Sequence, residues 1–144
     1  RLMIVGLNGK NGRNHKFFGE YDKANHTQLE TYKNFFINSH LLLHPARFDA
    51  SPIVTSEASA FGLPTITNDS GGLATSVKHN VSGIVLPKNS NSTDYVAVIK
   101  NLLLKPDKYK VLRQLTRERY KKSLNWEVAG DKLERIFNYA IDKK

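Results

Sequence analysis

The sequence predicts a protein of the α/β class, with a parallel sheet covered by helices on both faces. Short apolar runs that end at glycine or proline alternate with segments whose apolar residues recur at helical spacing, and this alternation is typical of parallel sheets. The composition agrees, because 40% of the 144 residues are hydrophobic and 24% are charged, as in globular chains. We expect one domain over residues 1–144. Arg1 is not an initiator methionine, so we expect the natural start to lie upstream.

The apolar runs predict about five short strands, each followed by a turn-forming residue. Gly6 closes the first run, Gly19 the second, Pro45 the third and Pro87 the last. The expected strands cover residues 2–6, 16–19, 40–44, 65–67 and 84–86. In open parallel sheets ligands bind beyond the carboxyl ends of the strands, so we expect the site in the loops that follow these strands.

Periodicity and helix-terminating residues predict the helices. They are expected over residues 28–38, 52–62, 73–78, 93–104, 106–122 and 126–141. The expected N-caps are His26 or Thr27 for the first helix, Ser51 for the second, Ser92 or Thr93 for the fourth and Asn125 for the last. Trp126, at the start of the last helix, is expected to be a core anchor.

The start of the second helix has the features of an anion site. Ser51 is a good N-cap, and Pro52 suits the first helical position, where a missing N–H costs nothing. The backbone N–H groups of Ile53 and Val54 then belong to the unpaired first turn, where the helix dipole also favours negative charge. All four residues are therefore candidate binding residues for a phosphate-sized anion.

Two carboxylates flank this helix start. Asp49 is expected in the loop before the helix, and Glu57 about one and a half turns into it. A phosphate-sized hole between two groups that can grip hydroxyls fits a nucleotide-sugar, in which a diphosphate lies between polyols. The alternatives are an exposed helix residue for Glu57 and, for Asp49, a loop acid that pairs with Arg47.

Several short motifs, in order, resemble the retaining glycosyltransferases of the GT-B fold, the glycosyltransferase group 1 family with a Glu-x7-Glu motif. The likeness covers nearly the whole chain, and the order and spacing of its pieces carry it. These pieces are residues 44–47, the motif 49–57 with Ala58, then 62–64, 69–72, 80–85 and 125–127. The resemblance implies a Rossmann-like domain, the C-terminal, donor-binding half of a GT-B enzyme, without the acceptor domain and without the first part of the donor domain.

The resemblance also implies roles for the residues of the second helix. Glu57 would accept hydrogen bonds from the ribose hydroxyls. Asp49, at the first acidic position of the motif, would contact hydroxyls of the donor sugar and would be the catalytic residue. The amides of Ile53 and Val54 would hold the distal phosphate. In the family an Arg and a Lys also clamp the diphosphate, from a segment that would precede Arg1.

Two glycine-containing loops complete the expected donor site. The loop with Gly19 and Glu20 resembles the segment that reads the edge of the base, and its alternative is an ordinary crossover turn. Gly71 and Gly72 would form a wall of the donor pocket, or alternatively an ordinary tight turn, because glycine lets backbone approach closely.

Two departures from the family pattern are visible. The first acidic position usually carries Glu, whereas here it carries the shorter Asp49. After the glycine pair the family commonly has Pro-Glu, whereas this chain has Ala74 and Thr75. The first departure could weaken a sugar contact or select another sugar, and the second removes a family acid.

The implied reaction transfers a sugar from a nucleoside diphosphate sugar to an acceptor hydroxyl with retention, as in polysaccharide or glycolipid assembly. The expected partners are the donor and a glycan or lipid-linked acceptor. We expect no cofactor and no metal, because amides and basic side chains can stabilise the leaving diphosphate. Cysteine is absent, and the histidines lack metal spacing. His40 and His44 are expected to be packing or loop residues. The alternative function is a non-catalytic nucleotide-binding or membrane-docking module of the same fold.

The formal charge of +9 is concentrated in the second half of the chain. Residues 1–72 hold 7 basic and 6 acidic side chains, whereas residues 73–144 hold 15 and 7. The excess lies mostly in residues 100–122, which form either a solvated helical face or a surface for anionic lipid. Nucleic acid is not expected, because stacking aromatics are not interleaved there. With no long apolar run, we expect a cytoplasmic protein, peripheral at the inner face of the membrane if the lipid alternative holds.

Overall fold

The structure, a computed structural model, describes residues 1–143, which divide into two compact units. Unit 1 is Arg1–Ser39, and unit 2 begins at His40. Both contain parallel strands flanked by helices, which confirms the predicted α/β class. The prediction of one domain over the whole chain stays a prediction.

Unit 1 is a small parallel pair of strands with one helix. Strand β1 (Leu2–Ile4) pairs with β2 (His15–Phe17), with Leu2 opposite His15. Helix α1 (His26–Ile37) follows, and the side chain of Asn25 caps it by accepting the N–H of Gln28, so the predicted caps His26 and Thr27 lie inside the helix. The unit is held by edge-to-face aromatic contacts along α1, such as Phe18 on Phe35, with ring centroids 4.7 Å apart.

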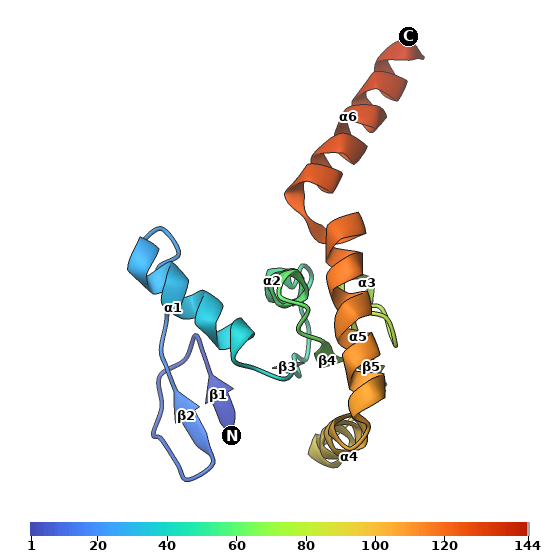
Figure 1. Ribbon diagram of the computed structural model, residues 1–144. Coiled ribbons are helices and arrows are strands. Elements are labelled where there is room, and N and C mark those ends of the chain that lie inside the picture. The colour runs from blue at the N-terminus through green and yellow to red at the C-terminus, as the bar shows by residue number, and fades with distance from the viewer. Residues whose placement is uncertain (144) are drawn as a thin grey trace. The chain divides into compact units, whose positions relative to one another are not determined.

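Unit 2 is built on a three-stranded parallel sheet in the order β3-β4-β5 (Figure 1). Its strands are β3 (Leu42–His44), β4 (Thr65–Asn68) and β5 (Gly83–Leu86). Its helices are α2 (Ile53–Ala60), α3 (Leu73–Ser76), α4 (Ser92–Leu103), α5 (Pro106–Arg119) and α6 (Trp126–Asp142), and a π-helical turn, η1 (Tyr120–Leu124), precedes α6. Figure 1 looks along the strands and shows α2 on one side of the sheet and α4 on the other.

The core of unit 2 lies on both faces of β4, all four residues of which are buried. Ile66 faces α4 and packs with Ile84 and Tyr95. Because side chains alternate along a strand, Thr65 and Thr67 face the opposite side of the sheet, where α2 and α3 contact β4. The sheet is therefore covered on both faces, and its strand ends are left to the loops.

Three sequence predictions about unit 2 are wrong in detail. Helix α2 begins at Ile53 with Pro52 as N-cap, so neither Ser51 caps it nor does Pro52 start it. Helix α4 is capped by Asn91, one residue before the predicted choices, because Asn91 accepts the amides of the first turn in a full capping box. Trp126 is 87% exposed and anchors no core within the described residues.

Candidate functional site

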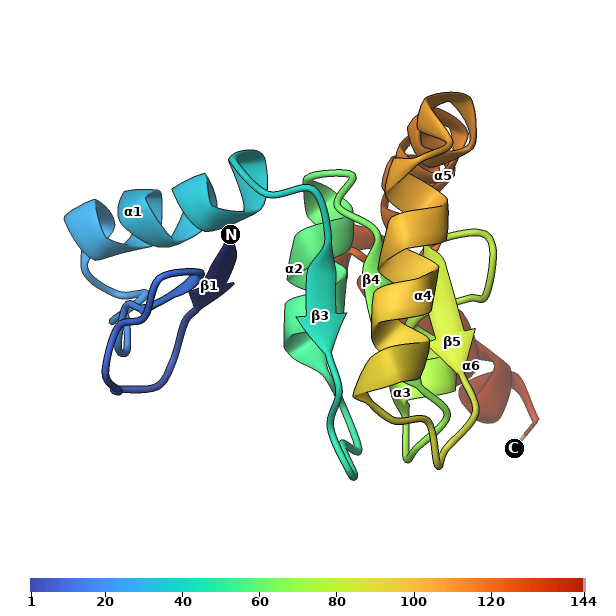
Figure 2. The same cartoon turned by 90° about the horizontal axis from the view of Figure 1, so that it is seen from below.

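Two loops meet at the carboxyl edge of the unit 2 sheet, residues 45–52 after β3 and residues 69–72 after β4. Figure 2 shows both loops extending beyond the same ends of the strands. Ser70 Oγ donates to the carbonyl oxygen of Arg47, and the Gly72 N–H donates to that of Asp49 at 2.8 Å. Below them, Thr67 Oγ1 donates to the His44 carbonyl at 2.8 Å. These bonds fix the loop before α2 against the glycine turn.

The glycine pair allows this contact because no side chain could stand there. A Cβ at Gly71 would lie 3.0 Å from the Asp49 carbonyl carbon, and one at Gly72 would lie 3.0 Å from that of Ala50, with the carbonyl oxygens closer still. Gly71 also has φ of +61°, which favours glycine. Both glycines therefore pack backbone on backbone, which gives them a structural role at the site edge.

The Asp49 carboxylate is held on both oxygens. Its Oδ1 accepts the N–H of Ser51 at 3.1 Å, and its Oδ2 lies 3.0 Å from His44 Nε2. A carboxylate offers about four lone-pair sites, so about two remain for a ligand. Asp49 therefore pairs with His44 in the structure, and not with Arg47, which was the alternative.

Sequence reasoning missed His44 as a site residue. It is the last residue of β3 and half-buried, and its ring reaches forward over the loop to Asp49. Its position at the carboxyl end of a strand, five residues before the acid, was the available signal. Together with the Ser51 N–H, the imidazole fixes the orientation of the Asp49 carboxylate.

Among the residues that the structure describes, the start of α2 leaves two amides without a protein partner. Pro52 is buried and has no N–H, while the Thr55 N–H turns back to the Pro52 carbonyl at 3.1 Å. Within residues 1–143 the N–H groups of Ile53 and Val54 have no hydrogen-bond acceptor. They are therefore available to an anion, and the one-residue shift of the helix start leaves this part of the prediction in place.

Glu57 lies one turn after these amides. At spacings of three and four from Val54 and Ile53, it shares their face of α2 and is half-buried. The amides of the first turn point out of the N-terminal end of α2, Glu57 follows them by one turn, and Asp49 lies in the loop before them. This juxtaposition is the one that a diphosphate with attached hydroxyls would fit.

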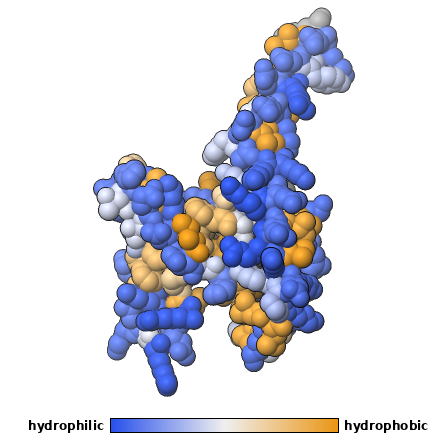
Figure 3. Space-filling view, viewed as in Figure 1, coloured by the Kyte–Doolittle hydropathy of each residue, from blue (hydrophilic) through white to orange (hydrophobic). Residues whose placement is uncertain are grey.

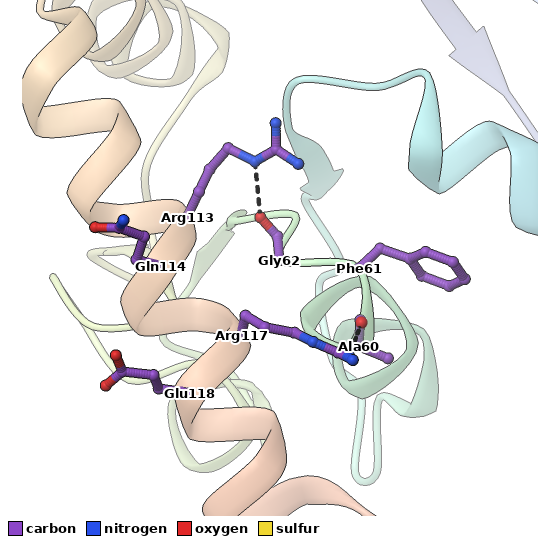
Figure 4. Close-up of a pocket in the computed structure, with 7 residues that line it drawn as sticks. All are labelled: Ala60, Phe61, Gly62, Arg113, Gln114, Arg117 and Glu118. Carbon is purple, nitrogen blue, oxygen red and sulfur yellow. Dashed lines mark hydrogen bonds between the residues drawn. The ribbon is translucent and has the colours of Figure 1, made fainter.

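The other end of α2 is held by arginines of α5. Figure 4 shows the hollow between the two helices, lined by Ala60, Phe61, Gly62, Arg113, Gln114, Arg117 and Glu118. Arg113 Nε donates to the Gly62 carbonyl at 3.1 Å, and Arg117 donates to that of Ala60. Guanidinium groups at a helix C-terminus satisfy its last carbonyls and complement its dipole. The two arginines that line this hollow therefore hold the C-terminal end of α2, opposite the candidate site.

A third arginine, Arg119, secures the glycine turn from behind. It donates to the carbonyls of Thr75 and Ser76, both in α3, and to Ser82 Oγ at 3.2 Å. Burial lowers the pKa of its guanidinium from the ordinary value. Since α3 directly follows Gly72, Arg119 helps to hold the turn that meets Asp49.

Gly19 and Glu20 belong to unit 1, where they follow β2. Gly19 has φ of +68°, and its carbonyl accepts the Gly6 N–H at 2.6 Å, so the loops after β1 and β2 also meet. Glu20 is exposed. That these residues share a pocket with those of unit 2 stays a prediction, as do the binding roles of the unit 2 residues. Among residues 1–143, no group of three potential metal ligands comes together.

Comparison with known proteins adds a family to this geometry. The model of the family described as glycosyl transferases group 1 matches residues 1–119. The chain belongs to that family.

Curated and solved relatives of this group 1 glycosyltransferase chain agree with one another. It is 31% identical to D-inositol 3-phosphate glycosyltransferase 1 of Catenulispora acidiphila over 102 residues, and this aligned region covers 71% of this chain and 24% of the relative. Sucrose-phosphate synthase of Thermosynechococcus elongatus matches with a TM-score of 0.73 at 23% identity, over 92% of this chain and 32% of that one. Anabaena HepE in complex with UDP-glucose matches with a TM-score of 0.70 at 17% identity, over 88% and 33%. These two structures show the GT-B glycosyltransferase fold.

The chain spans about a quarter of the curated relative's length and about a third of each solved neighbour. Within residues 1–143, no helix has both the length and the apolar character needed to cross a bilayer.

Proposed function

We propose that this chain forms the donor-binding part of a glycosyltransferase that takes a sugar from a nucleoside diphosphate sugar. The observation that carries the proposal is the pair of unpartnered amides of Ile53 and Val54, set between the carboxylates of Asp49 and Glu57. Family membership supports a transferase, and the fold neighbour solved with UDP-glucose supports a nucleotide-sugar as the class of donor.

In this proposal each group has a task. The amides of Ile53 and Val54 bind the distal phosphate and stabilise the negative charge that develops on the leaving diphosphate. Glu57 accepts from the ribose hydroxyls, and Asp49, oriented by His44, accepts from the sugar. The donor is itself the substrate, and we propose that no resident cofactor or metal is needed, since the fixed amide dipoles supply the charge stabilisation.

The finer features of the reaction are also proposals. We infer that the sugar is a hexose, that transfer proceeds with retention, and that the acceptor is a glycan or lipid-linked hydroxyl in polysaccharide or glycolipid assembly. The proposed location is the cytoplasm, where nucleotide-sugars serve as donors. The resemblance in sequence motifs supports these features.

The decisive experiment is titration calorimetry of the chain with UDP-glucose, UDP, GDP and ADP. Replacing Glu57 with alanine should weaken the preferred nucleotide about tenfold or more, because a hydrogen bond to a charged group contributes about 1.5–3 kcal/mol. The exposed Glu134 of α6 provides the matched control, and Glu134→Ala should bind like the parent chain. Equal affinity of Glu57→Ala and parent would contradict the proposal.

A non-catalytic nucleotide-binding module is the second candidate, favoured by the engagement of Asp49 with His44 and Ser51 on both carboxylate oxygens. In that case Asp49→Asn would leave nucleotide affinity unchanged, and the full-length protein would not release UDP from UDP-glucose in the presence of acceptor. Anomeric proton couplings of the product, measured by NMR, test retention if turnover occurs.

A further inference from the structure

The corner between α4 and α5 exposes large apolar side chains. Leu103 ends α4 and Leu104 is its C-cap, and they are 46% and 79% exposed, while Val96 is 45% exposed. Residues seven and eight apart lie on one helical face, so Val96 shares an outward face of α4 with the two leucines. We call Val96, Lys100, Leu103, Leu104, Lys105 and Lys108 the α4–α5 corner. Figure 3 shows hydrophobic side chains gathered over α4, beside the hydrophilic surface of α5.

The basic residues of this region fall into two sets. The arginines of α5 are directed to the protein, since Arg113, Arg117 and Arg119 all donate to backbone carbonyls of unit 2. The lysines are directed to solvent. Four lysine side chains are exposed, and their ammonium groups make no hydrogen bond or ion pair with any residue that the structure describes: those of Lys100, Lys105, Lys108 and Lys110. The positive charge of the lysines is therefore available to an outside partner.

The charge of this surface has a definite sign. Residues 96–111 contain four lysines and one acid, Asp107. The one aromatic side chain of α5, Tyr109, is occupied within the unit, because its hydroxyl donates to the His40 carbonyl at 2.8 Å. The surface thus lacks a stacking platform for nucleic-acid bases.

Exposed leucines framed by unpaired lysines match the chemistry of an anionic lipid surface. Lysine ammonium groups are attracted to the negative leaflet, and apolar side chains bury themselves at the level of the headgroups. Helix α6 offers a contrast, because its exposed Leu133 and Ile136 lie among charges of both signs, such as Asp131 and Lys132. Charge complementarity therefore selects the α4–α5 corner.

We propose that the α4–α5 corner docks unit 2 onto an anionic bilayer, with Leu103 and Leu104 inserted at the interface and the lysines on the headgroups. This surface lies on the side chains of α4 and α5 and uses none of the donor-site residues. An experiment that disproves membrane docking would therefore leave the proposed donor site untouched, and the reverse also holds.

The test is co-sedimentation of the chain with vesicles of phosphatidylcholine alone and of phosphatidylcholine mixed with phosphatidylglycerol. The parent chain should bind only the mixed vesicles, and salt should weaken binding. The double variant Leu103→Ser, Leu104→Ser should lose binding at least about tenfold, and Lys105→Gln and Lys108→Gln about fivefold each. All four side chains are exposed, so the melting temperature should be kept.

Matched controls come from α6. Lys132→Gln makes the same charge change as Lys108→Gln and should leave vesicle binding unchanged, as should Leu133→Ser. Equal binding to both kinds of vesicle, equal loss from Lys132→Gln, or unchanged binding of the leucine variant would each overturn the proposal. Sedimentation velocity adds one further outcome. A parent dimer that the leucine variant converts to a monomer, without vesicle binding, would assign the corner to a second copy of the chain.

Discussion

Replacing Gly72 with alanine tests the contact between the two loops of the candidate site. The new methyl group would stand 3.0 Å from the Ala50 carbonyl carbon and closer to its oxygen, and real Cβ atoms essentially never come within that distance. These are backbone atoms, which cannot rotate away as a side chain could. The loops must separate, and the bond from the Gly72 N–H to the Asp49 carbonyl, at 2.8 Å, lengthens or breaks.

The expected cost follows from two contributions. Overpacking typically destabilises by about 1–3 kcal/mol, and a lost hydrogen bond adds about 1 kcal/mol. Gly72 has φ of −85°, which alanine adopts without strain, so no backbone penalty is added. We expect the free energy of unfolding to fall by about 2–4 kcal/mol, or the melting temperature by about 10 °C or more in a unit of this size.

Gly130 supplies the control, because it is the same substitution in open space. It lies inside α6, and a Cβ there has no atom within 4 Å. Gly130→Ala should be neutral or stabilise by up to about 1 kcal/mol through helix propensity. Urea denaturation followed by circular dichroism measures both variants. If Gly72→Ala unfolds within about 0.5 kcal/mol of the parent, the reasoning on the glycine turn is wrong.

Three further substitutions test other contacts by the same denaturation assay. Tyr95→Phe should be neutral or stabilise by up to about 1 kcal/mol, because the buried hydroxyl has no hydrogen-bond partner in residues 1–143. Burial also raises the pKa of the Tyr95 phenol above its ordinary value of 10.0, so the phenol ionises more readily in the unfolded state than in the folded state. The free energy of unfolding should therefore fall as the pH rises past 10.0, and the Phe variant should show less of that fall. Asn91→Ala removes the N-cap of α4 and should cost about 1 kcal/mol, whereas an unchanged midpoint would contradict the capping box. Arg119→Gln should cost about 2 kcal/mol through its lost carbonyl contacts at Thr75 and Ser76, with the exposed Arg135→Gln as an unaffected control.

The sequence was sufficient for the identity of most elements because the signals are local. Apolar runs ended by glycine or proline mark β3, β4 and β5, and periodic spacing marks α1 and α4. The predicted cap Asn125 of α6 is confirmed, whereas the caps of α1, α2 and α4 were missed by one residue. At α1 and α4 neighbouring polar residues compete, and the cap is the one whose side chain reaches the first-turn amides. At α4 that residue is Asn91.

Long-range features could not be predicted from one sequence. Trp126 has the character of a core residue, but its burial depends on what packs against α6, and the described residues leave it exposed. The predicted helix 106–122 gives way at Tyr120 to a π-helical turn, where Asn125 Nδ2 donates to the carbonyls of Tyr120 and Lys121. Of the candidate site, Pro52 predicted the helix start to within one residue, whereas the pairing of His44 with Asp49 depends on how the strand end and the loop come together.

Helix α6 has a consequence for how the molecule opens. None of its 17 residues is buried, and most of the stability of a helix in a protein comes from tertiary packing, so α6 depends on the cap of Asn125 and the adjoining π-helical turn. Its amide hydrogens should therefore exchange with solvent deuterium orders of magnitude faster than those of the fully buried β4. The chain would lose and regain this last helix many times while the sheet of unit 2 stays folded.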